Sequence, residues 1–167
     1  MVDSLVESIV TALGGKISSE LVAFIVSLLP VLELRGGLVA AKLMDIDFFR
    51  AFAICYIGNI LPIPFILLFI RKIFNLMKRN RKIEEIIEKF EARSLRKADK
   101  VKKYRLWGLF IFVAIPLPGT GAWTGALVAD LLDIRIKHSL PVIALGVLVA
   151  GFIVSCLSYG LLGLLGL

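Results

Sequence analysis

The sequence contains few of the residues from which proteins build metal centres and redox sites. Its 167 residues include only two cysteines and one histidine. Cys55 and Cys156 both fall within apolar runs, where a cysteine is most simply a small packing residue. The chain has no zinc-ligand spacing, no P-loop, no dinucleotide-binding fingerprint and no catalytic triad. We therefore expect no cofactor, no metal, no enzymatic activity and no ATP-driven transport from this chain.

Charge is also scarce, except in one segment. Hydrophobic residues make up 59% of the chain and the mean hydropathy is +0.92, far above an ordinary soluble domain. Residues 78–105 contain twelve Lys or Arg and five acidic residues, a net charge of +7 that equals the net charge of the whole chain. Basicity confined to one loop argues against a nucleic-acid partner. Because Lys and Arg accumulate on the inner side of membranes, we expect this loop to be cytoplasmic.

Two apolar stretches are long enough to cross a membrane. Residues 140–167 carry no charge and would form about 42 Å of helix, against a hydrocarbon core of about 30 Å. Residues 48–70 carry only Arg50, whose long side chain can reach the headgroups. The sequence therefore predicts a multi-pass protein of the cell membrane.

One segment of the chain occurs twice. Residues 24–47 read FIVSLLPVLELRGGLVAAKLMDID, and residues 110–135 read FIFVAIPLPGTGAWTGALVADLLDIR. The matched pairs include Phe24/Phe110, Pro30/Pro116, Gly37/Gly125 and Asp45/Asp133. The offset rises from 86 to 88 within the segment, because the second copy has gained two residues before its glycine. Duplicated segments are typical of transporters, which place a substrate site between two related halves.

Neither copy has the pattern of an ordinary spanning helix. If the first copy were one straight helix, Glu33 and Arg35 would lie near mid-bilayer, where inserting each ionised residue costs about 2.5–3.5 kcal/mol. The second copy places two prolines and two glycines within residues 116–121. Broken backbone at membrane depth survives only where protein or a water-filled cavity covers it. We predict that each copy is a re-entrant helical hairpin, with a kinked spanning helix as the alternative.

These patterns together predict an all-α integral membrane protein with two inverted repeats. Because one span separates the copies, the first hairpin enters from outside and the second from the cytoplasm, and their tips can meet near the midplane. We divide the single membrane domain into an N-terminal interfacial helix, repeat 1, a basic linker and repeat 2, with the ranges 1–15, 18–77, 78–103 and 104–167.

Two further helices are expected to lie on the membrane surface. Residues 2–13 are expected to form a helix that stops at Gly14, with one apolar stripe made of Val2, Leu5, Val6, Ile9, Val10 and Leu13. In the linker, four apolar residues recur at helical spacing: Ile83, Ile86, Ile87 and Phe90. An amphipathic cytoplasmic helix with this much basic charge is suited to membrane lipids with anionic headgroups.

Glu33 and Arg35 form the only ionisable pair at a predicted buried tip. A carboxylate within the membrane indicates a proton or cation site, because burial raises its affinity for the proton and a nearby arginine lowers it. The alternative is an ion pair that only holds the hairpin together. In the first span, Asn59 lies beside Gly58 and Pro62, which together mark a kink with a polar residue inside it.

The second tip offers backbone groups instead of charges. Its glycines allow a ligand to approach the amides and carbonyls, and half-helix N-termini favour anions such as phosphate. The alternative is that the glycines only permit close helix packing. The candidate binding residues of this tip are Pro116, Pro118, Gly119, Thr120, Gly121, Trp123 and Thr124. Asp130 stands where the first copy has Lys42, so these two could pair between the copies, as a structural bridge or as a coupling element.

The paired strings PVLELRGGLVAAKL and PLPGTGAWTGALVADLLDI resemble the small multi-drug export protein family, a relative of the DedA/VTT membrane proteins. The resemblance covers residues 18–166 and implies the inverted re-entrant hairpins. It also implies movement of lipids or lipid-linked carriers, with proton coupling. DedA proteins carry arginines beside the prolines of the second hairpin, whereas this tip has no charge. Recognition of phosphate is therefore left to Arg35 and to backbone amides.

We expect a secondary transporter or lipid flippase, coupled to protons or cations, whose amphipathic or phosphate-bearing lipid substrate lies between the tips. A multidrug/proton antiporter acting as a homodimer is the first alternative, although such a protein should have four unbroken helices. An uncoupled, scramblase-like or structural membrane module is the second.

Overall fold

The computed structural model is mostly helical in the described part of the chain, which comprises residues 2–13, 17–77, 87–89, 92, 94, 99–117 and 119–158. No β-strand occurs among these residues. They form two compact units, each considered by itself. Unit 1 contains residues 1–62 and 147–167, and unit 2 contains residues 63–146.

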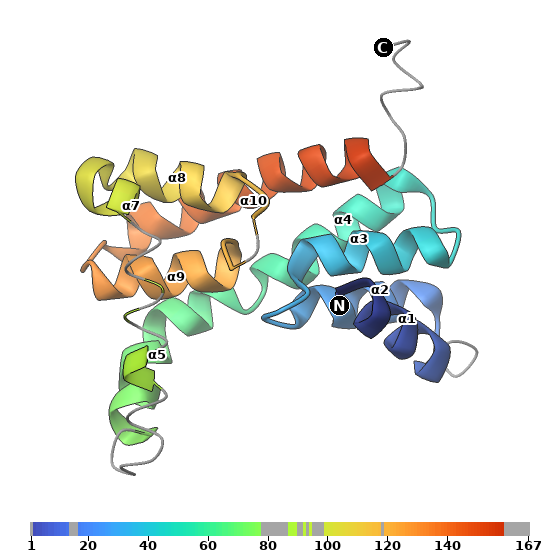
Figure 1. Ribbon diagram of the computed structural model, residues 1–167, viewed down its shortest axis with the longest axis horizontal. Helices are drawn as coiled ribbons and strands as arrows, with labels where there is room; N and C mark the ends of the chain where they lie inside the picture. Colours follow the sequence, from blue (N-terminus) through green and yellow to red (C-terminus); the bar gives the residue numbers. More distant parts are fainter. Residues whose placement is uncertain are drawn as a thin grey trace. The chain divides into compact units, whose positions relative to one another are not determined.

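Unit 1 is built from four short helices and the second half of a long one (Figure 1). The four are α1 (Val2–Leu13), α2 (Ser19–Leu28), α3 (Glu33–Leu43) and α4 (Phe48–Ile60), and the long one is α10 (Ile136–Ser158). Polar caps define where two of them begin. The Ser18 hydroxyl accepts a hydrogen bond from the Leu21 N–H at 3.3 Å, and the Asp47 carboxylate accepts one from the Phe49 N–H at 3.1 Å. Such side chains satisfy the otherwise unpaired N–H groups of a first turn.

Unit 2 contains the remaining helices and the first half of α10. These are α5 (Ile63–Met77), α7 (Asp99–Tyr104), α8 (Leu106–Ala114) and α9 (Ala122–Leu131). Helix α9 packs on both α5 and α8. The large side chains of unit 2 that are fully buried include Ile63, Leu109, Val113, Val128 and Ile143.

The chain reverses between α2 and α3, and the reversal depends on Gly37. A Cβ atom added there would overlap Ser27 Oγ and would lie 2.9 Å from Cys55 Sγ and 3.1 Å from the carbonyl oxygen of Ala23. Three helices therefore meet at this glycine with almost no space between them. Helices α2 and α3 therefore pack against each other as a hairpin, and its re-entry into a membrane stays a prediction. The structure also confirms Cys55 as a buried packing residue.

The second copy reverses in the same way around Gly125. A Cβ atom added there would lie 2.5 Å from Val113 Cγ2, with Leu109 and Ile143 as the next neighbours. Each of these three residues is the repeat counterpart of a neighbour of Gly37, because Val113, Leu109 and Ile143 correspond to Ser27, Ala23 and Cys55. The duplication is thus a duplication of packing as well as of sequence.

A second pair of glycines extends the correspondence into the helix that follows each hairpin. A Cβ atom at Gly58 would lie 2.9 Å from the carbonyl oxygen of Phe24, and one at Gly146 would lie 3.2 Å from the carbonyl oxygen of Phe110. Phe110 is the counterpart of Phe24 in the repeated segment. Each copy is therefore a three-helix element, α2–α3–α4 in unit 1 and α8, α9 and the first half of α10 in unit 2.

The helices α3 and α9 end in the same local structure. Asp45 and Asp133 both adopt the left-handed region, with φ of 52° and 50°. The Ile46 N–H donates to the Ala41 carbonyl at 3.0 Å, and the Ile134 N–H donates to the Ala129 carbonyl at 2.8 Å. This is the helix end that usually requires glycine, and aspartate is one of the few other residues that tolerate it.

The two long apolar stretches are confirmed as helices that could span a membrane, at Phe48–Ile70 and Ile136–Cys156. The first is interrupted at Leu61 and Pro62, where the sequence predicts a kink, and the kink itself stays a prediction. The second begins at Ile136 instead of residue 140, because its first turn is polar and lies outside the apolar run. Many large apolar side chains are exposed, among them Phe49 (78%) and Trp107 (74%), as expected of surfaces that contact lipid.

The structure also describes the expected surface helices in part. Helix α1 is confirmed, but part of its stripe is buried within the protein, because Val6 packs with Val22, Val26 and Leu32. Its interfacial position stays a prediction. In the linker, Ile83, Ile86 and Phe90 lie outside the described residues, and Ile87 is buried.

Candidate functional site

The first hairpin tip is a tight turn between two helices. The backbone leaves the helical region at Leu29, whose ψ is 135°, and Pro30 follows in the turn. The chain re-enters a helix at Glu33, whose N–H donates to the Leu29 carbonyl at 2.9 Å. The Gly36 N–H then donates to the Leu32 carbonyl at 2.8 Å. Glu33 is therefore the residue at which the chain turns back.

Glu33 combines two unusual features. Its φ of 51° lies in the left-handed region, which glycine adopts easily and glutamate rarely does. Its side chain is also buried, with 7% of the residue exposed. Left-handed backbone at a residue other than glycine costs about 1–3 kcal/mol, and such strain tends to collect at functional sites. The strain and the buried carboxylate therefore occur together at one residue.

Arg35 follows on the same turn of α3 and is half-buried. Its guanidinium interacts electrostatically with the Glu33 carboxylate. A carboxylate in these surroundings has a cation beside it and little water. Its charge state therefore depends on Arg35 and on any cation or proton that enters the tip.

Asn59 lies at the same end of unit 1 as the tip. Gly58, in α4, packs against Ser27 near the end of α2. Both helices end within a few residues of this contact, α2 at the cap residue Leu29 and α4 at the cap residue Leu61. Asn59 is 1% exposed. Within the part of the chain that the structure describes, its carboxamide oxygen accepts no hydrogen bond. Buried polar atoms are rarely left so, which makes this oxygen a candidate ligand group.

In the second tip, the loop is held together by hydrogen bonds of the Thr120 side chain. The Thr120 hydroxyl lies 2.9 Å from the carbonyl oxygens of Ile115 and Leu117, to which it can donate, and it accepts from the Leu117 N–H at 3.2 Å. Gly119 and Gly121 have φ of 79° and 145°, values that side-chain-bearing residues rarely adopt. The structure thus gives Thr120 and these glycines a role in shaping the loop. A role in binding stays a prediction.

The remaining residues predicted at the second tip surround this loop. Pro116 is half-buried before it, and Trp123 and Thr124 are half-buried in the first turn of α9. Pro118 lies outside the described residues. The two tips belong to different units, so their meeting at one substrate site stays a prediction.

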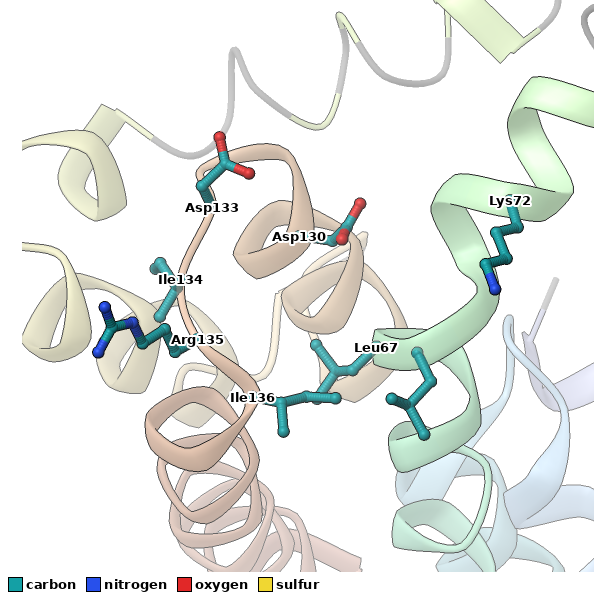
Figure 2. A pocket seen from close by; sticks show the side chains of 8 residues that line it. Leu67, Lys72, Asp130, Asp133, Ile134, Arg135 and Ile136 are labelled. Atoms are coloured by element: carbon teal, nitrogen blue, oxygen red, sulfur yellow. The ribbon is translucent and has the colours of Figure 1, made fainter.

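Asp130 lines a pocket of about 440 Å³ in unit 2, with Lys72 on the opposite wall (Figure 2). The predicted pairing of Asp130 with Lys42 joins residues of different units and is not tested. Lys72 and Asp133 are not among the site residues predicted from the sequence. The available signal was weak, because charged residues beside a span are normally interpreted as anchors in the headgroups.

Residues 33–153 match the family model described as "Putative small multi-drug export protein". The matched region runs from the first hairpin tip through most of α10. No curated protein and no solved structure matches the chain.

Proposed function

This chain belongs to the small multi-drug export protein family, and from that premise we propose that it is a secondary membrane transporter with a carboxylate-based coupling site at Glu33. In this proposal the α2–α3 and α8–α9 hairpins enter the bilayer from opposite faces, as an inverted pair. The substrate is held between the two tips. Glu33 takes up a proton or another cation during the cycle.

The observation that carries the proposal is the state of Glu33. A carboxylate whose only role was to form an ion pair within the hairpin would not require a left-handed backbone conformation. Here it is buried in a left-handed conformation, beside an arginine and at the turn between α2 and α3. Broken helices with polar groups at membrane depth are how secondary transporters form ion and substrate sites.

The lengths of the hairpin helices support re-entry. Helices of 10 residues in α2 and 11 in α3 extend about 15 Å and 16 Å, which is half of a hydrocarbon core of about 30 Å. Both ends of the first hairpin also lie on one side of unit 1. Glu20, at the start of α2, forms an ion pair of 3.7 Å with Arg50, at the start of α4. A hairpin of this length with both ends on one side reaches the midplane and returns.

The test compares purified wild type with Glu33→Gln in proteoliposomes under an imposed pH gradient, using a panel of cationic drugs and phospholipids. The substitution keeps the size of the side chain and removes its charge. We expect the variant to insert and fold but to lose the dependence of substrate movement on the pH gradient. Thermal stability of both proteins is measured alongside, to separate coupling from folding.

Glu20→Gln is the matched control, because it removes a carboxylate from the exposed base of the same hairpin. An exposed ion pair contributes little, so this variant should transport as wild type does. Arg35→Ala should lower thermal stability as well as transport, because it leaves the Glu33 carboxylate buried without its cation. Unchanged gradient-dependent transport by Glu33→Gln would reduce Glu33 to a structural role and remove the basis for proton coupling.

A further inference from the structure

Unit 2 contains a pocket of about 440 Å³ whose lining carries both signs of charge. Its walls come from α5, from the end of α9 and from the turn that leads into α10 (Figure 2). The volume falls within the range of about 300–1,000 Å³ that is usual for small-molecule sites. The lining residues are Leu67, Leu68, Lys72, Asp130, Asp133, Ile134, Arg135 and Ile136.

The pocket lies at the height where the two candidate spans end. Leu67 and Leu68 are near the last residue of the first span, and Lys72 comes just after it. Ile136 is the first residue of the second span, and Asp133 comes just before it. Most of the apolar lining therefore comes from the ends of the spans, and all of the charged lining comes from residues beyond them. A pocket whose lining changes from apolar to charged in this direction suits an amphiphile at the membrane surface, with its polar group outward.

The charges of the pocket are balanced. The lining carries two carboxylates, on Asp130 and Asp133, and two cations, on Lys72 and Arg135, so its net charge is zero. Asp130 and Lys72 project from opposite walls (Figure 2). A ligand with only positive or only negative charge would meet one favourable and one unfavourable wall. A ligand that carries both charges a few ångströms apart satisfies both walls.

We propose that this pocket binds the headgroup of a zwitterionic phospholipid that has a primary ammonium. The phosphate lies toward Lys72 and the ammonium toward Asp130, while the start of the acyl chains contacts Leu67 and Leu68. A primary ammonium donates three hydrogen bonds to carboxylate oxygens, whereas a quaternary ammonium donates none. The proposal does not rest on transport between the hairpin tips, because it concerns binding at a separate surface site.

The experiment measures binding to the purified full-length protein in a neutral maltoside detergent, by isothermal titration calorimetry. The probe is dihexanoyl phosphatidylethanolamine. We expect it to bind more tightly than the matching phosphatidylcholine, phosphatidylglycerol and a hexylammonium salt. Equal binding of phosphatidylglycerol or of hexylammonium would overturn the assignment of a zwitterion. Phosphoethanolamine without acyl chains is the last ligand, and binding as tight as that of the lipid would overturn the assignment of a membrane source.

Two substitutions remove one charge from each wall. Asp130→Asn and Lys72→Met should each weaken binding of phosphatidylethanolamine about fivefold, the size expected of a charge-assisted hydrogen bond in a partly exposed site. Unchanged binding in both variants would place the lipid elsewhere.

The duplication supplies a matched control. Asp133 and Asp45 occupy the same left-handed position at the ends of α9 and α3, but only Asp133 lines the pocket. Asparagine tolerates this conformation, so neither substitution should disturb the fold. Asp133→Asn should weaken binding and Asp45→Asn should not. An equal loss in the two variants would indicate an effect on the fold or on general surface charge, and would overturn the site.

Discussion

Gly125→Ala tests whether α8 and α9 approach each other as closely as the structure shows. The added Cβ would lie 2.5 Å from Val113 Cγ2, while the next two neighbours, on Leu109 and Ile143, are at an ordinary 3.8 Å and 3.9 Å. The conflict is thus with a single methyl group. Val113 is 1% exposed, so this methyl has no free space to enter.

The expected magnitude is a balance of two terms. Overpacking a close contact costs about 1–3 kcal/mol, and replacing glycine by alanine within a helix gains about 1 kcal/mol. Gly125→Ala should therefore lower the free energy of unfolding by up to ~2 kcal/mol. Val113→Ala alone should cost about 2 kcal/mol through the lost methyl groups and the space they leave. In the double variant the new methyl occupies part of that space, so the two costs should not add.

The assay is a double-mutant cycle, read as the free energy of unfolding in a maltoside detergent with increasing dodecyl sulfate. We expect the double variant to be more stable than the sum of the single variants predicts, by about 1–3 kcal/mol. Additivity within about 0.5 kcal/mol would show that Gly125 and Val113 do not touch, and would refute the packing described for unit 2.

The corresponding cycle in unit 1 should show a weaker rescue. Replacing Ser27 by alanine removes the hydroxyl that a Cβ at Gly37 would overlap. Cys55 Sγ at 2.9 Å and the Ala23 carbonyl oxygen at 3.1 Å would still be too close to that Cβ. The carbonyl belongs to the backbone of α2 and cannot move alone. The two cycles therefore distinguish Gly125, where an added methyl conflicts with one methyl group, from Gly37, where it conflicts with three groups.

Two further predictions follow from the hairpins and their ends. Cysteines introduced at Ser19 and Asp45 should both react with an impermeant thiol reagent from outside, and those at Arg105 and Lys137 only from the cytoplasm; labelling of Ser19 and Asp45 from opposite faces would exclude re-entry of the first hairpin. Asp45→Gly and Asp133→Gly should each raise the free energy of unfolding by about 0.5–1 kcal/mol, because glycine adopts the left-handed conformation without a steric cost; a loss of stability would mean that the carboxylates contribute more than their backbone costs.

The repeated three-helix packing was open to prediction from sequence because it depends on glycine. Gly37 and Gly125 stand at matched positions, and at each of them an added Cβ atom would lie too close to a side chain of a neighbouring helix. The repeats were predicted to include the spans that follow the hairpins, but the match between Gly58 and Gly146 was not predicted. These glycines lie in apolar spans where few neighbouring residues are shared, so nothing in the local sequence marks them as counterparts.

Other features of the fold could not be read from the sequence. Hydropathy shows where an apolar run begins, but the helix that contains it can begin several residues before that point, as α10 does at Ile136. The left-handed conformation at Glu33, Asp45 and Asp133 is normally signalled by glycine, which is absent at all three positions. The pocket at Asp130 depends on α5 and α9, which are far apart in sequence and are brought together only by the fold.

The two copies share their scaffold and differ at their tips. The glycine contacts and the helix ends correspond residue by residue, and they are the parts that packing constrains. The tips are less constrained by packing, and there the copies diverge. One carries a buried carboxylate beside an arginine, and the other carries a glycine loop fixed by Thr120. A symmetric pair would offer the same chemistry twice. An asymmetric pair can assign charge to one half and backbone hydrogen bonding to the other, which is the division of roles that the proposed coupled transport requires.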